Sequence, residues 1–423
     1  EAAGWGGGEM TLLDDHERGS AEQDEGVAVK EGWVIKTLGE VCVVVNGGTP
    51  KTDVLEYWDG DHRWITPAEM GKRLSPYVRD TTRRITELGL RESSVQMLPP
   101  GSVILSSRAP IGHLVINTEP MGTNQGCKGL IPHDLVETKF LYYYLSSIVE
   151  ILNSLGTGAT FKELSGAKLK AVPMPIPPLP EQQRIVALLD EAFEALATAK
   201  ANAEQNLKNA RALFERHLDL VFSQRGEGWM ETRLEEVCGL QNGFAFKSNT
   251  FKTSGTPILR ISNIQNGRID ESKGLVFIDT RDYQENLDRY RVNKHDLLIA
   301  MSGATTGKLG FNIKDRIYFL NQRVGKLEPG KNLEKRFLYY YLSTKVEENL
   351  RISAGSAQPN LSSEQIKDIV LPLPAVDEQM EIVNSLETLT AETQRLTSIY
   401  ERKLAALEEL KTSLLHQAFN GEL

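Results

Sequence analysis

The feature that most constrains the fold of this chain is an internal repeat that spans almost the whole sequence. When the chain is compared with itself at a shift of about 196 residues, islands of identical residues return in the same order. The first islands match Trp33, Leu38, Glu40, Val41, Cys42, Asn46, Gly47 and Lys51 with Trp229, Leu234, Glu236, Val237, Cys238, Asn242, Gly243 and Lys247. Later islands match Asn124 and Gln125 with Asn321 and Gln322, and the segment FLYYYLS at 140–146 with the same segment at 337–343. A period this long indicates a duplicated domain rather than a solenoid of short repeats.

Between these islands the two copies have unrelated sequences. Residues 51–63 differ from 247–257, and residues 72–97 differ from 268–291. A shared frame with different loops indicates one binding scaffold that reads two different targets. Neutral drift after a duplication would give the same pattern, and the sequence alone leaves both interpretations open.

Each copy ends in a proline-rich stretch, at 173–183 and at 372–379, and a segment typical of a long helix follows. Proline lacks the N–H that strands and helices use, and it disfavours helix in the residue before it, so both stretches are expected to be extended. Glu181 and Glu378 come next, where the positive end of a helix dipole favours a negative charge. Long helices are therefore predicted to begin near these two residues.

Both predicted helices carry apolar positions that repeat every seven residues. The two stripes run from 185 to 213 and from 189 to 217 in the first helix, and from 382 to 410 and from 386 to 414 in the second. This pattern is typical of coiled coils, and small residues in the first helix match large ones in the second, so we expect the two helices to pack as an antiparallel pair. At about 1.5 Å per residue, about 40 residues make a rod of about 60 Å. A helix that lies on its own domain stays open as the alternative.

The formal net charge of −9 is unusual for a nucleic-acid binder, so its distribution matters. Residues 1–31 hold nine acidic and two basic residues and are expected to form an acidic disordered tail. The globular parts are weakly basic, with net charges of +1 for 32–180 and +3 for 226–374. This distribution permits DNA binding without requiring it, and it fits a protein whose partners supply many of the phosphate contacts.

The sequence has no apolar run of about 18 residues and no basic-then-apolar N-terminus of the kind that signal peptides have. A cytoplasmic location is therefore expected. The three cysteines, Cys42, Cys127 and Cys238, lack the paired spacing of zinc sites and of disulfide frameworks. We expect them to be buried free thiols, which is the usual state of unpaired cysteine.

Motifs of common enzymes fail in detail. The segment GATTGK at 303–308 resembles a phosphate-binding loop, but it has too few residues between its glycines and Leu309 where Ser or Thr is required. The sequence contains no H-E-x-x-H and no G-x-S-x-G elbow. The Asn/Asp-Pro-Pro-aromatic loop of amino-group methyltransferases is absent, because the two Pro-Pro pairs are followed by Gly101 and Leu179. We therefore expect a non-catalytic chain that binds no metal and no cofactor itself.

The order of the islands, repeated twice with a long helix after each, resembles that of type I restriction-modification specificity subunits over residues 33–423. The first copy reads LGEVCVVVNGGTPK, WITP, VILSSRAPIG, NQGCKG, FLYYYL and GTGATFKELS. The second reads LEEVCGLQNGFAFKS, ILRISNIQNG, LLIAMSGATTGK, NQRVGK, FLYYYL and SAGSAQPNLS. No single island is diagnostic, but their shared order is a strong signal.

The resemblance implies that each globular region is a target-recognition domain reading one half of an interrupted double-stranded DNA site. It implies further that the helices act as a spacer and as the dock for two modification (adenine methyltransferase) subunits, to which restriction (endonuclease) subunits add. S-adenosylmethionine, ATP and magnesium would then belong to those partners, and no membrane is involved.

The expected fold class is α+β, with two mixed α/β target-recognition domains separated by two long antiparallel coiled-coil-like helices and related by a pseudo-twofold axis. The expected divisions are a tail at 1–31, a first recognition domain at 32–180, a first helix at 181–225, a second recognition domain at 226–377 and a second helix at 378–423.

Candidate DNA contacts are polar loop residues, because Asn, Gln, Arg, Ser and Thr can bond to base edges while Lys mainly holds phosphate. The candidates in the first copy are Thr49, Lys51, Trp64, Thr66, Arg108, Lys128, Thr157, Thr160 and Lys162. Those in the second are Lys247, Ser248, Arg260, Ser262, Asn263, Ser302, Lys308, Arg323 and Ser356. The Asn-Gly pairs at 46–47 and 242–243 are expected to form turns instead, because Asn-Gly readily takes positive φ.

Two other functions stay open at this point. One is the specificity subunit of a methyltransferase system that has no nuclease, which neighbouring genes would distinguish. The other is a coiled-coil scaffold that binds protein and never touches DNA. Retention of a DNA duplex that is lost with rising salt would separate this scaffold from a DNA reader.

Overall fold

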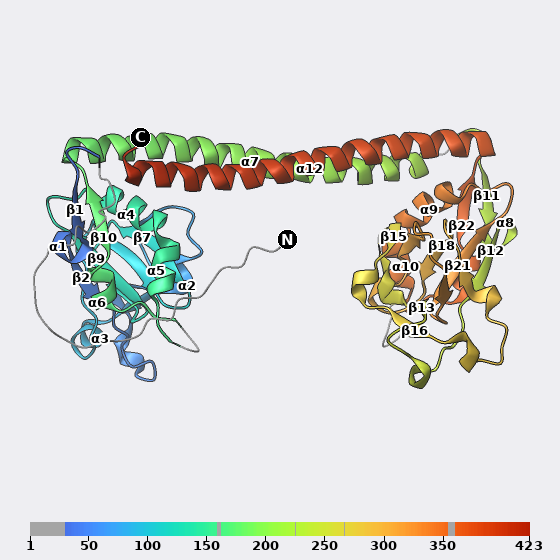
Figure 1. Ribbon diagram of the computed structural model, residues 1–423, viewed down its shortest axis with the longest axis horizontal. Helices are drawn as coiled ribbons and strands as arrows, with labels where there is room; N and C mark the ends of the chain where they lie inside the picture. The colour runs from blue at the N-terminus through green and yellow to red at the C-terminus, as the bar shows by residue number, and fades with distance from the viewer. Residues whose placement is uncertain (1–29, 159–161, 225, 266, 354–359) are drawn as a thin grey trace, which may run out of the picture. The chain divides into compact units, whose positions relative to one another are not determined.

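The computed structural model describes residues 30–158, 162–224, 226–265, 267–353 and 360–423. It divides into two compact units: unit 1 comprises Glu1–Lys200 and Ala405–Leu423, and unit 2 comprises Ala201–Leu404 (Figure 1). Most of the expected acidic tail lies outside the described residues. Among the described residues, no helix is both long and apolar enough to cross a membrane.

The globular part of unit 1 comes from the first sequence copy. Its elements in chain order are β1 (Val34–Thr37), α1 (Leu38–Val41), β2 (Cys42–Asn46), η1 (Leu55–Tyr57), β3 (Trp58–Ile65), α2 (Pro67–Met70), β4 (Tyr77–Val78), β5 (Arg83–Ile85), α3 (Glu87–Arg91), β6 (Val103–Ser107), β7 (Ile111–Asn117), β8 (Gly122–Thr123), β9 (Cys127–Pro132), α4 (Thr138–Ser147), α5 (Val149–Leu155), α6 (Gly166–Lys170) and β10 (Pro173–Ile176). Two long helices, α7 (Leu179–Ser223) and α12 (Val376–Asn420), contribute to both units.

The globular part of unit 2 comes from the second copy. Its elements are β11 (Met230–Arg233), α8 (Leu234–Val237), β12 (Cys238–Asn242), η2 (Ser248–Thr250), β13 (Thr256–Leu259), η3 (Ile261–Asn263), β14 (Ile264–Gln265), β15 (Gly267–Ile269), η4 (Glu271–Lys273), β16 (Val276–Ile278), η5 (Thr280–Asp282), η6 (Asp288–Tyr290), β17 (Arg291–Val292), β18 (Leu297–Ala300), η7 (Gly303–Thr305), β19 (Leu309–Phe311), β20 (Tyr318–Leu320), β21 (Val324–Pro329), α9 (Lys335–Thr344), α10 (Val346–Ser353), α11 (Ser363–Lys367) and β22 (Val370–Leu373).

The main sheet of each unit is built on the same frame of antiparallel strands. The order is β2-β9-β6-β7 in unit 1 and β12-β21-β18-β19 in unit 2. To this frame unit 1 adds β4, which pairs parallel with β7, whereas unit 2 adds β15, which pairs parallel with β19, and then β14. Strand β4 lies within 72–97, where the two copies have unrelated sequences. The islands therefore build the common frame, and in unit 1 a divergent segment builds one of its edges.

The central strand β6 is buried on both faces because its side chains alternate between two cores. Val103 and Leu105 belong to the core that includes α4 and the long helices. Ile104 points to a second core that includes Ile65 and Met121. The second core separates the main sheet from a smaller one, β5-β3-β8, whose counterpart in unit 2 is β16-β13-β20-β17.

In unit 1, the start of α7 and the end of α12 pack against α4 and against each other. Phe419 of α12 lies 5.1 Å from Phe140 between ring centroids, and the two belong to one buried core with Ile185 of α7. Arg184 donates to the carbonyl of Leu423, and further along α7 Lys200 forms an ion pair with Glu408. The partner number falls as the α7 number rises, so the two helix segments run antiparallel. Unit 2 repeats the arrangement, with Phe222 of α7 packed 5.4 Å from Phe337 of α9.

The proline-rich stretches are extended, as predicted, and the helices begin close to the expected residues. Strands β10 and β22 occupy them and pair antiparallel with β1 and β11. Helix α7 begins at Leu179 and α12 at Val376, each two residues before the predicted glutamate. Pro180 sits in the first turn of α7, where the missing N–H has no helical partner to lose.

The seven-residue stripes hold only in part. Ala203 and Ala210 are buried, but Leu213 and Leu410, the last positions of the other stripe in each helix, are exposed. Later in α7 the neighbouring positions Phe214 and Val221 pack on the core of unit 2 instead. An α-helix with 3.6 residues per turn drifts by about 20° per heptad from a 3.5-residue repeat, so about five heptads displace the contact face by one residue.

Gln182 and Gln379 are fully buried and tie the long helices to the globular parts. The Gln182 side chain accepts from the Glu137 N–H at 2.8 Å and donates to the carbonyls of Leu135 at 2.9 Å and Pro177 at 2.8 Å. The equivalent bonds of Gln379 join it to Glu334, Asn332 and Pro374. Both amides use one acceptor and two donors, so burial leaves them satisfied. The recurring Glu-Gln pair of the sequence therefore marks a joint between helix and recognition domain.

Candidate nucleic-acid interface

Three of the predicted residues of unit 1 gather where strand β6 ends. The Thr49 hydroxyl accepts from the Asn124 side chain at 3.0 Å. Arg108 forms an ion pair with Glu163 at 3.8 Å, and Thr157 exchanges two backbone hydrogen bonds with the same glutamate. Thr49 and Arg108 thus lie beside the turn that Asn124 begins, and Thr157 is linked to Arg108 through Glu163. Arg108 keeps about a third of its side chain exposed, at 35%.

The remaining candidates of unit 1 are scattered. Lys51 and Lys162 are exposed, and Thr160 lies outside the described residues. Thr66 is the N-cap of α2, where its hydroxyl accepts from the Glu69 N–H at 3.3 Å. A capping role explains this threonine without DNA.

The candidates of unit 2 gather around the two short helices η3 and η7. Lys308 donates to the Gln265 side chain at 3.2 Å, and Gln265 in turn donates to the Ser262 carbonyl at 3.0 Å. Arg260 donates to the carbonyl of Gly274. Arg260, Ser262 and Lys308 are therefore brought together. The other candidates are the exposed Lys247, Ser248 and Arg323, together with Ser356, which lies outside the described residues.

Four predicted contacts are corrected by the structure, because their side chains are buried. Trp64 is 1% exposed, and Asn263 is fully buried with its amide used by the backbone of its own turn. Lys128 lies on the inner strand β9 and is 6% exposed, and Ser302 is 5% exposed. Residue type alone could not reveal this, because burial depends on what packs over each face of the sheet, and those segments lie far apart in the sequence.

The prediction of positive-φ turns at the Asn-Gly pairs is also wrong. Gly47 and Gly243 are absent from the positive-φ residues of the described chain, and Asn46 and Asn242 end strands β2 and β12. A Cβ on Gly47 would lie 2.0 Å from the Asn124 carbonyl oxygen. The glycine is needed because the backbone of the Asn-Gln turn passes directly over it.

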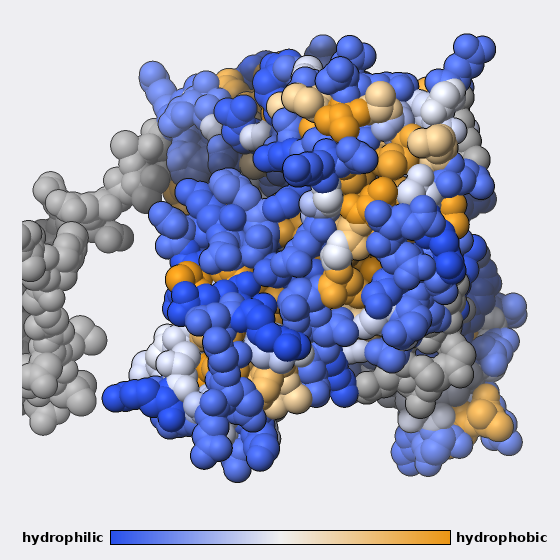
Figure 2. Space-filling view, turned by 90° about the vertical axis from the view of Figure 1, so that its right-hand side faces the viewer, coloured by the Kyte–Doolittle hydropathy of each residue, from blue (hydrophilic) through white to orange (hydrophobic). Residues whose placement is uncertain are grey.

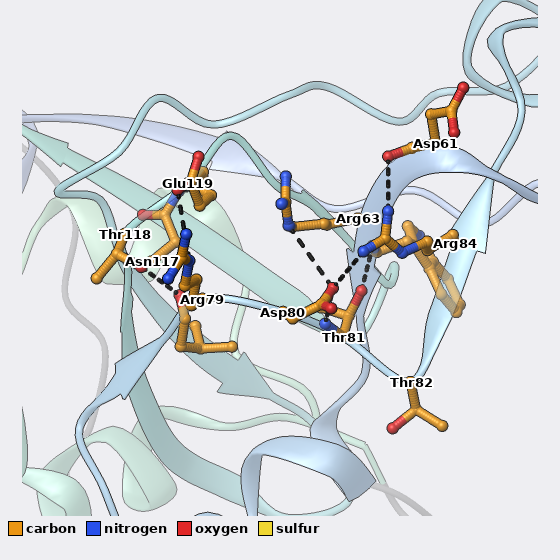
Figure 3. Close-up of polar contacts among 12 residues, drawn as sticks. Asp61, Arg63, Arg79, Asp80, Thr81, Thr82, Arg84, Asn117, Thr118 and Glu119 are labelled. Carbon is orange, nitrogen blue, oxygen red and sulfur yellow. Dashed lines mark hydrogen bonds and ion pairs between the residues drawn. The ribbon is translucent and has the colours of Figure 1, made fainter.

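An arginine-rich surface of unit 1 was missed by the sequence reasoning. Its members are Arg63, Arg73, Arg79, Arg83 and Arg84, all within or beside the segment that differs between the copies. Figure 3 shows Arg63 and Arg84 on either side of Asp80; Arg84 donates to the Asp80 carboxylate at 2.7 Å, and Arg63 lies 3.6 Å from the same oxygen. The density of arginines in this segment was the available signal.

One acid, Asp80, and two tryptophans position Arg63, Arg83 and Arg84. The pKa of Asp80 is lowered because the Thr81 N–H and then Arg84 donate to its carboxylate. The guanidinium of Arg83 lies 3.8 Å from the Trp58 ring centroid, and Trp58 packs edge-on against the buried Trp64. Trp64 therefore packs against Trp58, whose ring contacts the Arg83 guanidinium, and does not contact a ligand itself.

The matching region of unit 2 has a different character. Phe244, Phe246, Tyr283 and Tyr290 form an aromatic cluster, and the guanidinium of Arg289 lies 4.7 Å from the Tyr290 ring centroid. The face of unit 2 in Figure 2 is mainly hydrophilic, with hydrophobic side chains confined to patches. The two units thus build different side-chain clusters on related frames.

The three cysteines are free and buried, as predicted. Burial raises the pKa of each thiol to about 12. The described residues contain no group of three or more His, Cys, Asp or Glu side chains that could hold a metal ion.

Comparison with known proteins agrees with the division of the chain into two related units. A family model described as the type I restriction modification DNA specificity domain matches twice, at residues 30–209 and 226–408. The specificity subunit of the type I restriction enzyme MjaIX from Methanocaldococcus jannaschii is 27% identical, over 95% of this chain and 96% of that protein.

Two solved structures share the fold. One, from a study of complex assembly and conformational transition of the type I R-M system, has a TM-score of 0.76 at 20% identity and covers 94% of this chain and all of the other. The HsdS subunit from Thermoanaerobacter tengcongensis has a TM-score of 0.63 at 19% identity, over 93% of this chain and 98% of that one. With both matches of the family model covering most of its length, this chain belongs to the type I restriction modification DNA specificity family, as a DNA-recognition subunit that is not itself an enzyme.

Proposed function

We propose that unit 1 and unit 2 each read one half of a bipartite DNA site. The observation that carries this proposal is the contrast between frame and edges. Both units use the same antiparallel strands, yet unit 1 groups arginines around Asp80 and rests Arg83 on Trp58, whereas unit 2 packs phenylalanines and tyrosines together and places Arg289 on Tyr290. An asymmetric DNA site needs chemically different readers, because each base pair shows its own donor and acceptor pattern in the major groove.

We propose further that the long helices dock two modification subunits, to which restriction subunits add. Support comes from apolar side chains on these helices that stay exposed, among them Leu188, Leu213 and Leu410 at 42%, 50% and 48%. Leu213 and Leu410 occupy equivalent positions of the two copies, as two docking sites for identical partners would require. In this proposal S-adenosylmethionine, ATP and magnesium bind to the partners, and the assembly acts on host DNA in the cytoplasm.

The test is to sequence methylated adenines in the DNA of the host with and without this chain. We expect one bipartite sequence, with two short specific parts separated by a fixed gap, to lose its methylation when the chain is removed. Restoring the chain on a plasmid should restore the same sequence. An identical methylation pattern in both strains, in cells where the partner subunits are expressed, would contradict the proposal.

A further inference from the structure

The two units place equivalent residues at the end of the central strand. In unit 1 the Ser107 N–H donates to the Gly126 carbonyl, and the next residue, Arg108, forms a bridge with Glu163. In unit 2 the Met301 N–H donates to the Arg323 carbonyl, and the next residue, Ser302, forms a bridge with Asn360. Arg108 therefore corresponds to Ser302, and Gly126 corresponds to Arg323.

The arginine and the small residue have exchanged places between the units. Unit 1 has arginine at the strand end and glycine in the turn, whereas unit 2 has serine at the strand end and arginine in the turn. A Cβ on Gly126 would meet Cγ and Nε of Arg108, both at 3.1 Å, so the Arg108 side chain lies across Gly126. In unit 1 the large side chain at this place comes from the strand end; in unit 2 the strand end has Ser302, and the arginine stands in the turn.

Both guanidinium groups are available to a ligand. Arg108 is about a third exposed, and its ion pair with Glu163, at 3.8 Å, is too long for a charge-assisted hydrogen bond. Arg323 is exposed. Each follows or adjoins the Asn-Gln turn that the two copies share, so the surrounding backbone is the same in both units.

We propose that Arg108 and Arg323 are equivalent phosphate anchors, one for each half of the DNA site; this rests on the proposed function. Two half-sites of different sequence have different base edges but the same phosphate backbone. A charged group that both units bring to one place on the frame is therefore suited to what the half-sites share. The arginine fork bonds phosphate oxygens in a bidentate manner, which fixes the position of the duplex without reading its sequence.

The test uses the full chain assembled with its modification subunits and measures duplex binding over a series of salt concentrations. Arg108→Ser should weaken binding about tenfold at low salt and reduce the slope of log affinity against log salt by about 0.9. The loss should be the same for the cognate half-site and for half-sites with single base changes. Arg323→Gly should do the same for the other half.

The exchanged positions allow a rescue. In the double variant Arg108→Ser with Gly126→Arg, unit 1 adopts the arrangement of unit 2, and we expect affinity and salt slope to return toward wild type. Gly126 is not among the positive-φ glycines, so an arginine there causes no backbone strain. Arg108→Lys keeps the charge without the fork, and it should keep the salt slope while losing affinity. All variants should unfold at the same temperature as the wild type, which is the control for folding. If the double variant does not fold, Arg323→Gly still tests the proposal.

Three results would overturn the anchor: unchanged binding by Arg108→Ser and Arg323→Gly, a change of base preference in either variant, or no rescue by a correctly folded double variant. These results can be interpreted only if the wild-type complex binds its bipartite duplex more tightly than a scrambled duplex. If the wild-type complex binds that duplex no better than a scrambled one, the proposed function itself fails, and the two failures are thereby distinguished.

Discussion

The two recognition units differ least where they meet the long helices and most where they are open to a ligand. The buried Gln182 of unit 1 and Gln379 of unit 2 make the same three hydrogen bonds. Both units also have an ion pair between the recognition domain and the helix, formed by Lys139 and Asp190 in unit 1 and by Arg336 and Glu387 in unit 2. Tyr144 and Tyr341 both donate to a carbonyl of the strand that precedes the helix.

Away from the long helices, the two units have different strands and different side-chain clusters. Unit 1 adds β4 and the arginines around Asp80, whereas unit 2 adds β14, β15 and an aromatic cluster. The difference teaches that the helix joint tolerates little variation at Gln182 and Gln379, because these amides are buried and each of their polar atoms has a partner. The exposed edge carries no such constraint, so it can change with the target.

The strongest test of this contrast is an exchange of one unit's recognition part. Replacing residues 33–172 by the matching region of a relative, joined within the shared frame, should change one half of the methylated site completely and leave the other half unchanged. Methylome sequencing of cells carrying the chimera measures both halves at once. A change in both halves would break the separation of the two readers.

The next largest effect concerns the helices that both units share. One heptad added to both α7 and α12, near Ala203 and Tyr400, lengthens each by about 10 Å, or roughly three base pairs at about 3.4 Å each. We expect the preferred gap between half-sites to grow by that amount, and a heptad in one helix alone to weaken assembly. Methylation of a library with fixed half-sites and variable gap gives the answer. An unchanged gap in the folded double extension would show that the helices do not set it.

The equivalence of the two joints can be tested by stability. Gln182→Ala leaves one buried N–H and two buried carbonyls without partners, and it should lower the free energy of unfolding by about 2–4 kcal/mol. Gln379→Ala should cost a similar amount, because its three bonds are the same. The neighbouring Gln183 is exposed, so Gln183→Ala is the matched control and should change stability by less than about 0.5 kcal/mol. Urea unfolding measures all three, and a large difference between Gln182→Ala and Gln379→Ala would deny that the joints are equivalent.

A smaller and local effect is expected from the arginine-rich surface. Arg84→Ala removes a guanidinium held by Asp80, and it should weaken binding about tenfold and relax base preference only in the half-site that unit 1 reads. The half-site of unit 2 is the internal control within the same complex. Equal relaxation in both halves, measured by competition with singly substituted duplexes, would mean that Arg84 acts through assembly rather than through reading.

The smallest expected effect concerns the buried cysteines, which both units contain. Because burial raises the pKa of Cys42, Cys127 and Cys238 to about 12, the thiol form is favoured in the folded protein. This stabilisation is complete below an ordinary thiol pKa of about 9 and is lost as the pH rises from there through about 12. At pH 8 a thiol-reactive dye should label none of the three in the folded chain and all three in urea. Rapid labelling of Cys238 alone would show that unit 2 opens more readily than unit 1.

The sequence alone predicted the duplication, the extended proline-rich stretches, the starts of both long helices and the buried thiols. These follow from local rules, because hydrophobic period, proline and helix-end charge act over a few residues. The candidate site was predicted less well. Thr49, Arg108 and Thr157 gather at one strand end, but Trp64, Lys128, Asn263 and Ser302 are buried.

Only the tertiary structure decided which polar groups face outward and which positions are equivalent. Lys128 is 6% exposed on an inner strand, and its strand's neighbours, β2 and β6, come from segments far apart in the chain. The exchange of Arg108 and Gly126 for Ser302 and Arg323 is invisible in an alignment, because neither arginine faces an arginine there. It emerges once the turn is folded onto the strand end, where the Arg108 side chain of unit 1 lies across Gly126. Sequence fixes what each segment can do by itself, and packing decides which segments share a place.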